Sequence, residues 1–360
     1  MGDITSRGQF GVERMAIVGD LADSPQHLDL PAELLDRWTR VSGPLSRTVI
    51  VARQGTTIVG AAITVRRSLA SYLKVSDIWV DAPANSAAAV EDALATEAEQ
   101  IAWESGAIVV KRECQAAGLP LRPGYVRVEA PEITEPVPDA VTAVPEAHFL
   151  WRTRTARTTV PYMRQTSDFT CGGASLSMAL AQAGRIDRLS RTIELDIWRE
   201  ATTILACDPF GLALAASARG LTPTVTTSTD ETLFLENVET EHEIDLRRYI
   251  QSSFREQSRY SGIQSSLHPF SVEDLAAVIR AGGAAIVLVD ELLVHGQECP
   301  HWILVHGMEG DIFLAHDPWT EPSMGESWVD SYDLPLPPSA LDQIAWTGSP
   351  RYRAMLTFNP

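Results

Sequence analysis

The sequence contains few cysteines, four among 360 residues, and they lie far apart in the chain. None of them forms a Cys-x-x-Cys pair, the spacing that structural zinc sites and thioredoxin-like redox centres use. Both kinds of site are therefore disfavoured, and we expect free thiols in a reducing cytoplasm. The four cysteines are Cys114, Cys171, Cys207 and Cys299.

Long hydrophobic runs are missing as well. No apolar stretch reaches the roughly 18 residues that a membrane-spanning helix needs, and the N-terminal segment contains no apolar core of signal-peptide length. Gly2 followed by Ser6 matches a myristoylation pattern superficially, but isolated matches of this kind are common. The sequence therefore predicts a cytoplasmic protein that does not bind a membrane.

Basic residues are outnumbered. There are 29 Lys and Arg against 47 Asp and Glu, which gives a net charge of −18. Binding nucleic acid requires clustered Lys and Arg that displace counterions, so this balance argues against a nucleic-acid partner. It also argues against an anionic membrane surface. The excess acid is compatible with a soluble enzyme or with a basic partner, and its simplest role is to keep the protein in solution.

What remains is the composition of an ordinary globular protein, with 45% hydrophobic and 21% charged residues. At about 150 residues per domain the length predicts two domains, and the chain reads as two unlike halves without an internal repeat. In the first half, β-branched residues on both sides of a Gln-Gly-Thr turn predict a pair of strands over 48–67. The same reasoning predicts a helix over 86–105 and further strands over 76–82, 107–114, 124–131 and 148–155.

The second half begins near residue 157 and places its helices before most of its strands, an order typical of an α+β domain. A Pro-rich acidic stretch over 132–147 precedes it and predicts a loop. The elements expected in the second half are a strand over 159–165, helices from Cys171 to Gly184 and over 189–205, 212–219 and 271–283, strands over 222–227 and 284–290, and a hairpin over 301–318.

Cys171 is the strongest candidate for a nucleophile. It opens a predicted helix, whose positive end favours a thiolate. Gly172 and Gly173 follow it and are expected to let a substrate approach the backbone closely. Gln165 lies six positions earlier, where its amide could donate a hydrogen bond to a developing oxyanion beside the backbone N–H of Cys171.

His301 and Asp317 form the second part of the pattern. His301 begins the first strand of the predicted hairpin, and Asp317 follows its return strand. A turn at Glu309-Gly310-Asp311 would bring these two ends side by side. Since a carboxylate fixes the tautomer of a histidine and supports its charged form, the pair predicts a Cys-His-Asp site in which Cys171 is the nucleophile and His301 the base.

The second half resembles the bacteriocin-processing peptidase family, the papain-like cysteine proteases that remove leader peptides after a double-glycine site, together with their stand-alone relatives. QTSDFTCGGASLSMAL (165–180), HWILVHG (301–307) and FLAHDPW (313–319) carry the resemblance, which spans roughly residues 157–345. It implies a papain-like fold with Cys171 as nucleophile, His301 as base, Asp317 as orienting group and Gln165 as oxyanion residue. The segment 228–270 is longer than a minimal member requires and could be a substrate-covering insertion.

Several other aromatic, histidine and cysteine residues lie near these motifs or elsewhere in the chain. Trp302 and Trp319 flank the site residues and could wall a substrate groove, although core packing is the simpler role. His306 and His316 lie in the same hairpin, but no second Cys or His cluster completes a metal site, so no metal is expected. Cys114 and Cys207 are interpreted as structural, and Cys299 as a packed or loop thiol that could exchange with Cys171 if the two lie close.

The first half resembles the GCN5-related N-acetyltransferase fold in its order of strand, strand, strand, helix, strand and late strand pair. Members of that family bind the pyrophosphate of acetyl-CoA at a Gly-rich turn before the helix. The corresponding stretch, DAPANSAAAVEDAL (81–94), has no Gly, Arg or Lys and carries acids instead. We therefore expect a degenerate acetyltransferase-like domain over 1–156 without a cofactor, acyl-CoA included, and a peptidase domain over 157–360.

Three functions remain open from the sequence. The first is a cysteine peptidase or peptide amidohydrolase that works through a thioester, with a peptide as substrate. The second uses the same site to transfer the acyl group to an amine in a biosynthetic pathway. The third is a peptide-binding protein without catalysis, against which the intact set of Gln, Cys, His and Asp argues. The physiological substrate and the oligomeric state are not predicted.

Overall fold

The computed structural model describes residues 10–17, 30–31, 34–35, 38, 45–131, 144–153, 159–236 and 238–359. The chain divides into two compact units. Described residues up to 130, together with 144–153 and 321–330, form the first unit, and 159–320 and 331–359 form the second. The expected boundary at residues 156 and 157 and most of the Pro-rich stretch 132–147 lie outside the described residues.

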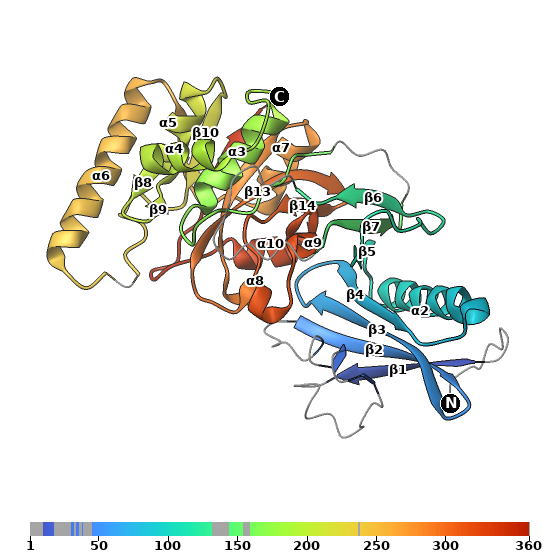
Figure 1. The fold of residues 1–360 in the computed structure, drawn as a ribbon. Helices are drawn as coiled ribbons and strands as arrows, with labels where there is room; N and C mark the ends of the chain where they lie inside the picture. The colour runs from blue at the N-terminus through green and yellow to red at the C-terminus, as the bar shows by residue number, and fades with distance from the viewer. Residues whose placement is uncertain are drawn as a thin grey trace. The chain divides into compact units, whose positions relative to one another are not determined.

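The first unit is built on a seven-stranded sheet (Figure 1). Its first four strands are antiparallel neighbours, while β4 and β5 are parallel because α2 connects them across one face of the sheet. The elements are β1 (Gly11–Ile17), β2 (Leu45–Gln54), β3 (Thr57–Arg67), β4 (Tyr72–Val80), α2 (Ala84–Glu104), β5 (Val109–Cys114), β6 (Val126–Glu129) and β7 (Glu146–Trp151), with strand order β1-β2-β3-β4-β5-β7-β6.

The predicted elements of this half are confirmed, with boundaries moved by a few residues. The strand pair over 48–67 is β2 and β3, whose turn contains Gly55 at a φ of 63°, a conformation that glycine adopts without strain. The predicted helix is α2, which buries Val90, Leu94 and Ala98 against one face of the sheet. Their spacing of four residues places them on one side of the helix, as the hydrophobic periodicity indicated.

A short segment from the second half of the sequence completes the first unit. The chain leaves the second unit after Thr320 and returns to it at Ser331, and the intervening residues 321–330 belong to the first unit. They include the 3-10 turn η2 (Pro322–Met324) and the beginning of α9 (Trp328–Ser331). Met324 packs with Leu45 and Val65 in a small apolar cluster. We call residues 321–330 the returning segment.

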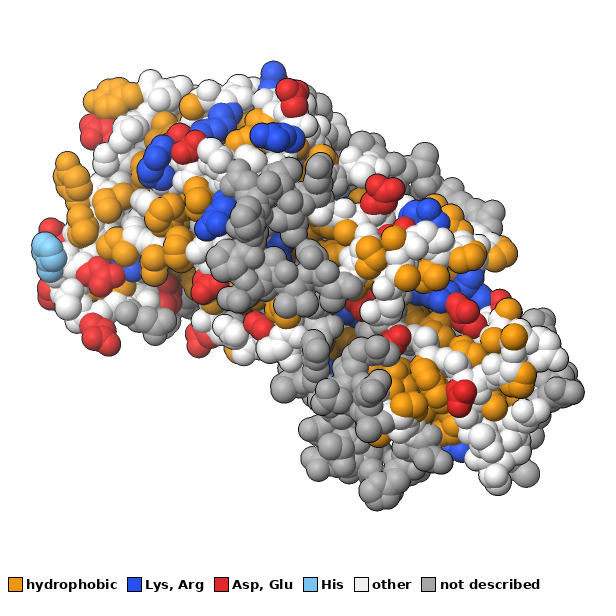
Figure 2. Space-filling model, in the orientation of Figure 1, with side chains coloured by type: hydrophobic (Ala, Val, Ile, Leu, Met, Phe, Trp, Pro, Cys, Tyr) orange, Lys and Arg blue, Asp and Glu red, His pale blue; other side chains and the backbone are white. Residues whose placement is uncertain are grey.

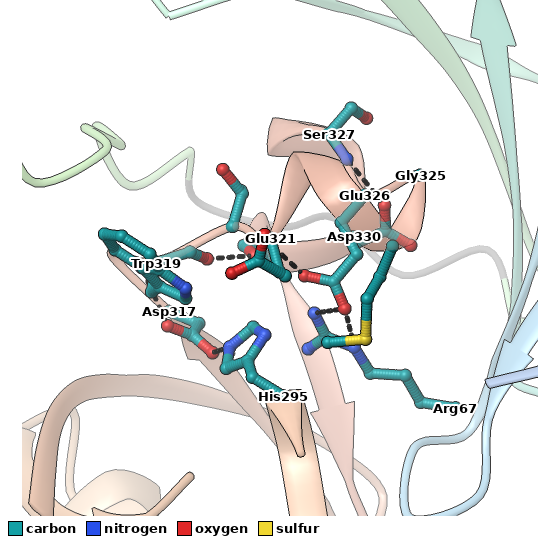
Figure 3. Close-up of polar contacts among 12 residues, drawn as sticks. Arg67, His295, Asp317, Trp319, Glu321, Gly325, Glu326, Ser327 and Asp330 are labelled. Atoms are coloured by element: carbon teal, nitrogen blue, oxygen red, sulfur yellow. Dashed lines mark hydrogen bonds and ion pairs between the residues drawn. The ribbon is translucent and has the colours of Figure 1, made fainter. Parts of the chain in front are cut away.

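Buried charges hold the returning segment. Arg67 and Glu326 form an ion pair of 2.7 Å with side chains at most 3% exposed (Figure 3). Lys74 is fully buried and pairs with both Asp330 and Glu113. Burial alone would lower the pKa of Lys74, but the two carboxylates raise it above its ordinary value. Removing one member of a buried ion pair is strongly destabilising. The pairs of Arg67 with Glu326 and of Lys74 with Asp330 therefore favour the observed position of the returning segment within the first unit.

The second unit contains a seven-stranded sheet with helices packed around it (Figure 1). The strand order is β11-β10-β16-β12-β13-β14-β15. The elements are α3 (Cys171–Gln182), α4 (Arg191–Ala201), β8 (Thr202–Thr203), β9 (Ala206–Cys207), α5 (Pro209–Ala218), β10 (Pro223–Thr227), α6 (Glu241–Tyr260), β11 (Gln264–Leu267), α7 (Val272–Arg280), β12 (Ala284–Asp290), α8 (Leu292–His295), β13 (Pro300–Glu309), β14 (Ile312–His316), β15 (Leu334–Leu336), α10 (Pro338–Ile344) and β16 (Ala354–Phe358).

Most predicted elements of this half are found, and one is not. The hairpin over 301–318 is β13 and β14, with Gly310 in its turn at a φ of 62°. The predicted strand over 159–165 is wrong, because these residues form no regular element. The backbone N–H of Gln165 donates to Pro318 O and not to a neighbouring strand. The apolar residues Val160, Tyr162 and Met163 are nevertheless buried, which explains the misleading pattern.

The long segment over 228–270 folds mainly into α6 and the edge strand β11. α6 buries polar side chains, among them Arg247 and Gln251, and turns Leu246, Tyr249 and Tyr260 outward. These three are 41%, 72% and 77% exposed, and in Figure 2 hydrophobic side chains lie on the surface over this helix. α6 thus places three large apolar side chains on a surface whose other exposed residues are mostly polar.

The prediction of an α+β fold in two parts is confirmed by these two mixed units. None of the helices among the described residues combines the length and the apolar character that crossing a membrane requires.

Candidate active site

Cys171 lies where the sequence predicts it, at the first position of α3, and is 7% exposed. The backbone N–H groups of a first helical turn have no acceptor inside the helix, and the helix dipole adds positive potential there. Both effects favour an anion at this sulfur. Its side chain also reaches His301, with which it shares a hydrogen bond.

His301 and Asp317 meet as the hairpin predicts. Nε2 of His301 is 2.8 Å from Oδ1 of Asp317, and the two side chains are 3% and 1% exposed. The same carboxylate oxygen accepts a hydrogen bond of 2.9 Å from the backbone N–H of Trp319. The register places His316 opposite Leu304, so His301 and Asp317 are diagonal neighbours that their side chains bring together.

Two further residues belong to this cluster, and the sequence analysis missed both. Oε1 of Glu291 is 2.9 Å from Nδ1 of His301. Nε2 of His295 is 2.9 Å from Oδ2 of Asp317, a contact drawn in Figure 3. In the connection between β12 and β13, Glu291 directly precedes α8 and His295 is the last residue of α8. Glu291, His301, Asp317 and His295 therefore form a buried chain in which carboxylates and imidazoles alternate.

Within this row of four side chains, the neighbouring groups shift the pKa values of His301 and Asp317. Burial opposes a charge on His301, but the carboxylates of Glu291 and Asp317 raise the pKa of its imidazole well above the ordinary value. Burial would raise the pKa of Asp317, yet His295 and His301 lower it well below the ordinary range. A histidine whose two nitrogens both face carboxylates can donate to both only as imidazolium. The two contacts with carboxylates therefore favour the charged form of His301.

Gln165 lies in the irregular segment before α3 and is 2% exposed. Its backbone N–H donates to Pro318 O at 2.8 Å, which ties it to the loop after Asp317. One amide N–H donates to Ser167 O at 2.8 Å. The amide oxygen, Oε1, is buried and has no hydrogen-bond partner among the described residues.

Glu194 braces the loop that leads to Cys171. It is fully buried in α4 and accepts hydrogen bonds from Thr166 N at 2.8 Å, Thr166 Oγ1 at 2.7 Å and Thr170 Oγ1 at 2.5 Å. Three donors on one carboxylate fix the backbone immediately before the nucleophile. No sequence pattern distinguishes this residue, because an acid in an amphipathic helix normally faces solvent.

The two glycines after Cys171 serve packing, which corrects the expectation that they expose backbone to a substrate. A Cβ on Gly172 would lie 2.7 Å from Cβ of Cys207, and one on Gly173 would lie 2.5 Å from Glu194 O. Either distance is shorter than side chains tolerate. The glycines therefore let α3 approach β9 and α4 closely, and both are buried.

The two tryptophans near the site differ. Trp302 is 1% exposed, and its indole N–H donates to Cys207 O at 3.0 Å, so it lies in the core beneath α3 and offers no surface to a substrate. Trp319 is partly exposed, directly after the loop that carries Asp317, and the guanidinium of Arg164 lies 4.9 Å from its ring centre. Of the two, only Trp319 can wall a groove.

All four cysteines are free, as expected. Burial raises the pKa of the Cys207 thiol well above its ordinary value. Burial, reinforced by Glu291, also raises the pKa of Cys299 to about 11. Both thiols are therefore protonated at neutral pH.

Two further histidines of the hairpin, His306 and His316, meet in a cluster with an aspartate. Ligand atoms of His306, His316 and Asp333 lie within 4.8 Å of one another. Nδ1 of His316 accepts from Asp333 N at 3.1 Å, which leaves Nε2 to donate to Val160 O at 3.0 Å. Because both nitrogens of His316 are engaged, this cluster does not offer three free ligands to a metal.

Replacing Glu291 with Gln should lower the pKa of His301, because one of the two carboxylates that raise it is removed. The measurement is an NMR titration of the imidazole in a Cys171→Ala background, with the signal identified by its loss in His301→Gln. Glu298→Gln, in the same connection, is the control. An unchanged His301 titration in Glu291→Gln would show that this contact does not set its charge.

Comparison with known proteins gives a family for the second unit. A family model described as the Peptidase_C39 like family matches residues 160–359, more than half of the chain. A search of curated proteins found no match.

Three solved structures are similar at low identity. A protein described as a C39-like peptidase from Bacillus anthracis is 13% identical over 56% of this chain and 95% of that chain, with a TM-score of 0.30. A tandem GNAT protein from the clavulanic acid biosynthesis pathway is 14% identical over 31% and 40%, with a TM-score of 0.23, so this chain spans less than half of its length. An acetyltransferase from Bacillus cereus is 16% identical over 34% and 94%, with a TM-score of 0.20. At these scores none of the three supports a conclusion about this chain.

Proposed function

Since the chain belongs to the Peptidase_C39 like family, we propose that it is a cysteine peptidase or peptide amidohydrolase that works through Cys171, His301, Asp317 and Gln165. The observation that carries the proposal is the pairing of a cysteine at a helix N-terminus with a buried histidine that two carboxylates hold as imidazolium. An imidazolium beside a thiol favours the thiolate, the form of cysteine that attacks carbonyl carbon.

The proposed reaction has two stages. Sγ of Cys171 attacks the carbonyl carbon of the substrate, and the oxyanion accepts hydrogen bonds from the Gln165 amide and the backbone N–H of Cys171. His301 donates its proton to the leaving amine as the carbon–nitrogen bond breaks, which leaves a thioester. Water then attacks the thioester and gives a proton to His301, and the acid departs as the thiolate returns. Asp317 keeps the imidazole oriented through both stages.

For the first unit we propose a degenerate acetyltransferase-like fold that does not bind acyl-CoA. The support is the order of its elements and the composition of the stretch before and within the start of α2. This stretch, residues 81–94, offers no glycine turn and no basic side chain, while Glu91 and Asp92 add negative charge. A pyrophosphate needs free N–H groups and positive potential at such a turn.

Alkylation rates test whether Cys171 is a reactive thiolate, and the test does not require the substrate to be known. With iodoacetamide near pH 7, Cys171 is expected to react at least about tenfold faster than Cys207 or Cys299, since a thiol of pKa 11 is only about 0.01% ionised at that pH. Mass spectrometry of the modified peptides measures the rates. Cys299 is exposed and Cys171 is not, so exposure alone predicts the opposite order. A Cys171 rate no higher than that of Cys207 would contradict the proposal.

Products test the reaction class. The wild-type protein and Cys171→Ala are incubated with a mixture of synthetic peptides, with and without added amines, and new termini are read by mass spectrometry. New carboxyl ends that only the wild type forms support hydrolysis. Amide products that require the added amine would instead establish acyl transfer, and products formed equally by Cys171→Ala would rule out the site.

A further inference from the structure

Cys114, Glu146 and His148 meet inside the first unit, and none of them is used in the proposed reaction. One ligand atom from each, a sulfur, a carboxylate oxygen and an imidazole nitrogen, lies within 4.8 Å of the other two. The three residues are 0%, 5% and 1% exposed. Thiol, imidazole and carboxylate are the three donors that proteins use for zinc.

The sheet brings these side chains together by register. Cys114 ends β5 and is the direct partner of Glu146, which begins β7. His148 lies two residues further along β7 and therefore points to the same face as Glu146. Val110 on β5 and Leu150 on β7 point to the same face of the sheet as the cluster, because side chains two or four residues apart on a strand share a face. Both pack in the core beneath α2, so this is the face that α2 covers. The cluster is thus a fixed feature of two paired strands.

The imidazole of His148 is the observation that points to a ligand. Its Nε2 is buried and has no hydrogen-bond partner of good geometry among the described residues. Oε1 of Glu146 is 3.5 Å away, at the limit for a hydrogen bond. The thiol of Cys114 makes only a weak contact of 3.9 Å with Arg112 O. A buried nitrogen without a partner is unusual and requires an explanation.

Neighbouring groups hold the carboxylate of Glu146 in place, as residues behind the ligands do in metal sites. The backbone N–H of Gly118 donates to its Oε1 at 3.0 Å. The guanidinium of Arg127 lies 3.5 Å from its other oxygen, Oε2, and is itself 38% exposed. A metal ion at Oε1, the oxygen that faces His148, would share the carboxylate with the guanidinium of Arg127 at Oε2. Such contacts orient ligating carboxylates in known metal sites.

We propose that Cys114, Glu146 and His148 bind a divalent transition-metal ion of the zinc type. A bond forms between the metal and the sulfur, the thiol proton passes to solvent, and no atom changes oxidation state. Three protein ligands leave the fourth tetrahedral position to water. The ion would join β5 to β7 and, through Gly118, to the loop after β5. It does not depend on the proposed peptidase activity.

Cobalt binding tests the site, because a thiolate ligand gives cobalt a charge-transfer absorption in the near ultraviolet. The full-length protein carries Cys171→Ala and Cys299→Ser, so that the thiols of the candidate active site cannot contribute. Addition of Co²⁺ is expected to produce the thiolate band with one ion per chain. Cys114→Ser should abolish the band, and His148→Gln should weaken binding by about tenfold or more.

Cys207→Ser is the matched control, since it removes the other fully buried thiol, and it should leave the band unchanged. Near-ultraviolet circular dichroism verifies that each variant is folded. A band that survives Cys114→Ser, or the absence of stoichiometric cobalt uptake by the folded parent, would overturn the proposal.

Discussion

Replacing His301 with Gln is expected to lower kcat/KM for peptide hydrolysis by about 10⁴-fold or more. Glutamine can accept and donate hydrogen bonds but cannot carry the charge that stabilises a thiolate or deliver a proton to the leaving amine. The loss should appear mainly in kcat, because His301 acts on the reacting atoms rather than on substrate binding. The measurement uses a peptide that the wild type cleaves.

His306→Gln supplies the control for this prediction. His306 lies on the same strand, β13, and its imidazole faces Asp333 at 3.2 Å instead of the candidate site. Its replacement should change kcat/KM by less than about threefold. If His301→Gln retained a tenth or more of the wild-type activity, His301 would not be the base, and Cys171 would have to be activated by another group.

Replacing Asp317 with Asn should reduce the free energy of unfolding by about 3 kcal/mol at neutral pH. Asp317 is fully buried and serves three donors, the two imidazoles of His295 and His301 and the backbone N–H of Trp319. An amide has one oxygen and one NH₂ group, so at least one of these donors would face another donor. Urea denaturation measures the loss.

The pH dependence of this loss follows from the pKa shifts. The folded-state pKa of Asp317 is lowered, so its contribution is complete above the ordinary carboxyl value of about 3.9 and is lost as pH falls through the folded value. The folded-state pKa of His301 is raised, so the contribution of its charge is lost as pH rises through that value. The difference between wild type and Asp317→Asn should therefore be largest between these limits.

Asp311→Asn, in the exposed turn of the same hairpin, controls for the general effect of removing a carboxylate. It should change the free energy of unfolding by less than about 0.5 kcal/mol. A difference between wild type and Asp317→Asn that stayed constant down to pH 3 would show that the carboxylate acts through packing alone and not through its charge.

The sequence was sufficient to predict which residues a turn would bring together. A glycine turn between two apolar strands identified the hairpin, and the hairpin placed His301 beside Asp317. Local rules succeed here because both residues belong to one continuous antiparallel pair. Their catalytic roles, and that of Gln165, remain predictions.

Residues that act across unpaired segments were not predictable in this way. Glu291 and His295 lie in the connection between β12 and β13, where the four-residue helix α8 is too short to show a periodicity. Glu194 reaches the Cys171 loop from a separate helix. Gly172 suggested room for a substrate, while the structure uses it for contact with Cys207. In each case the deciding contact joins elements distant in sequence, and a single sequence contains no information on such packing.

The returning segment has a consequence for how the protein is made. A ribosome releases the strands of the first unit early, yet Asp330 and Glu326, the partners of Lys74 and Arg67, emerge only after most of the second unit has been translated. Nascent domains commonly fold in the order of their synthesis. Here the first unit receives the returning segment only after residues 159–320 have been made. Its final assembly therefore waits for most of the second unit to be synthesised.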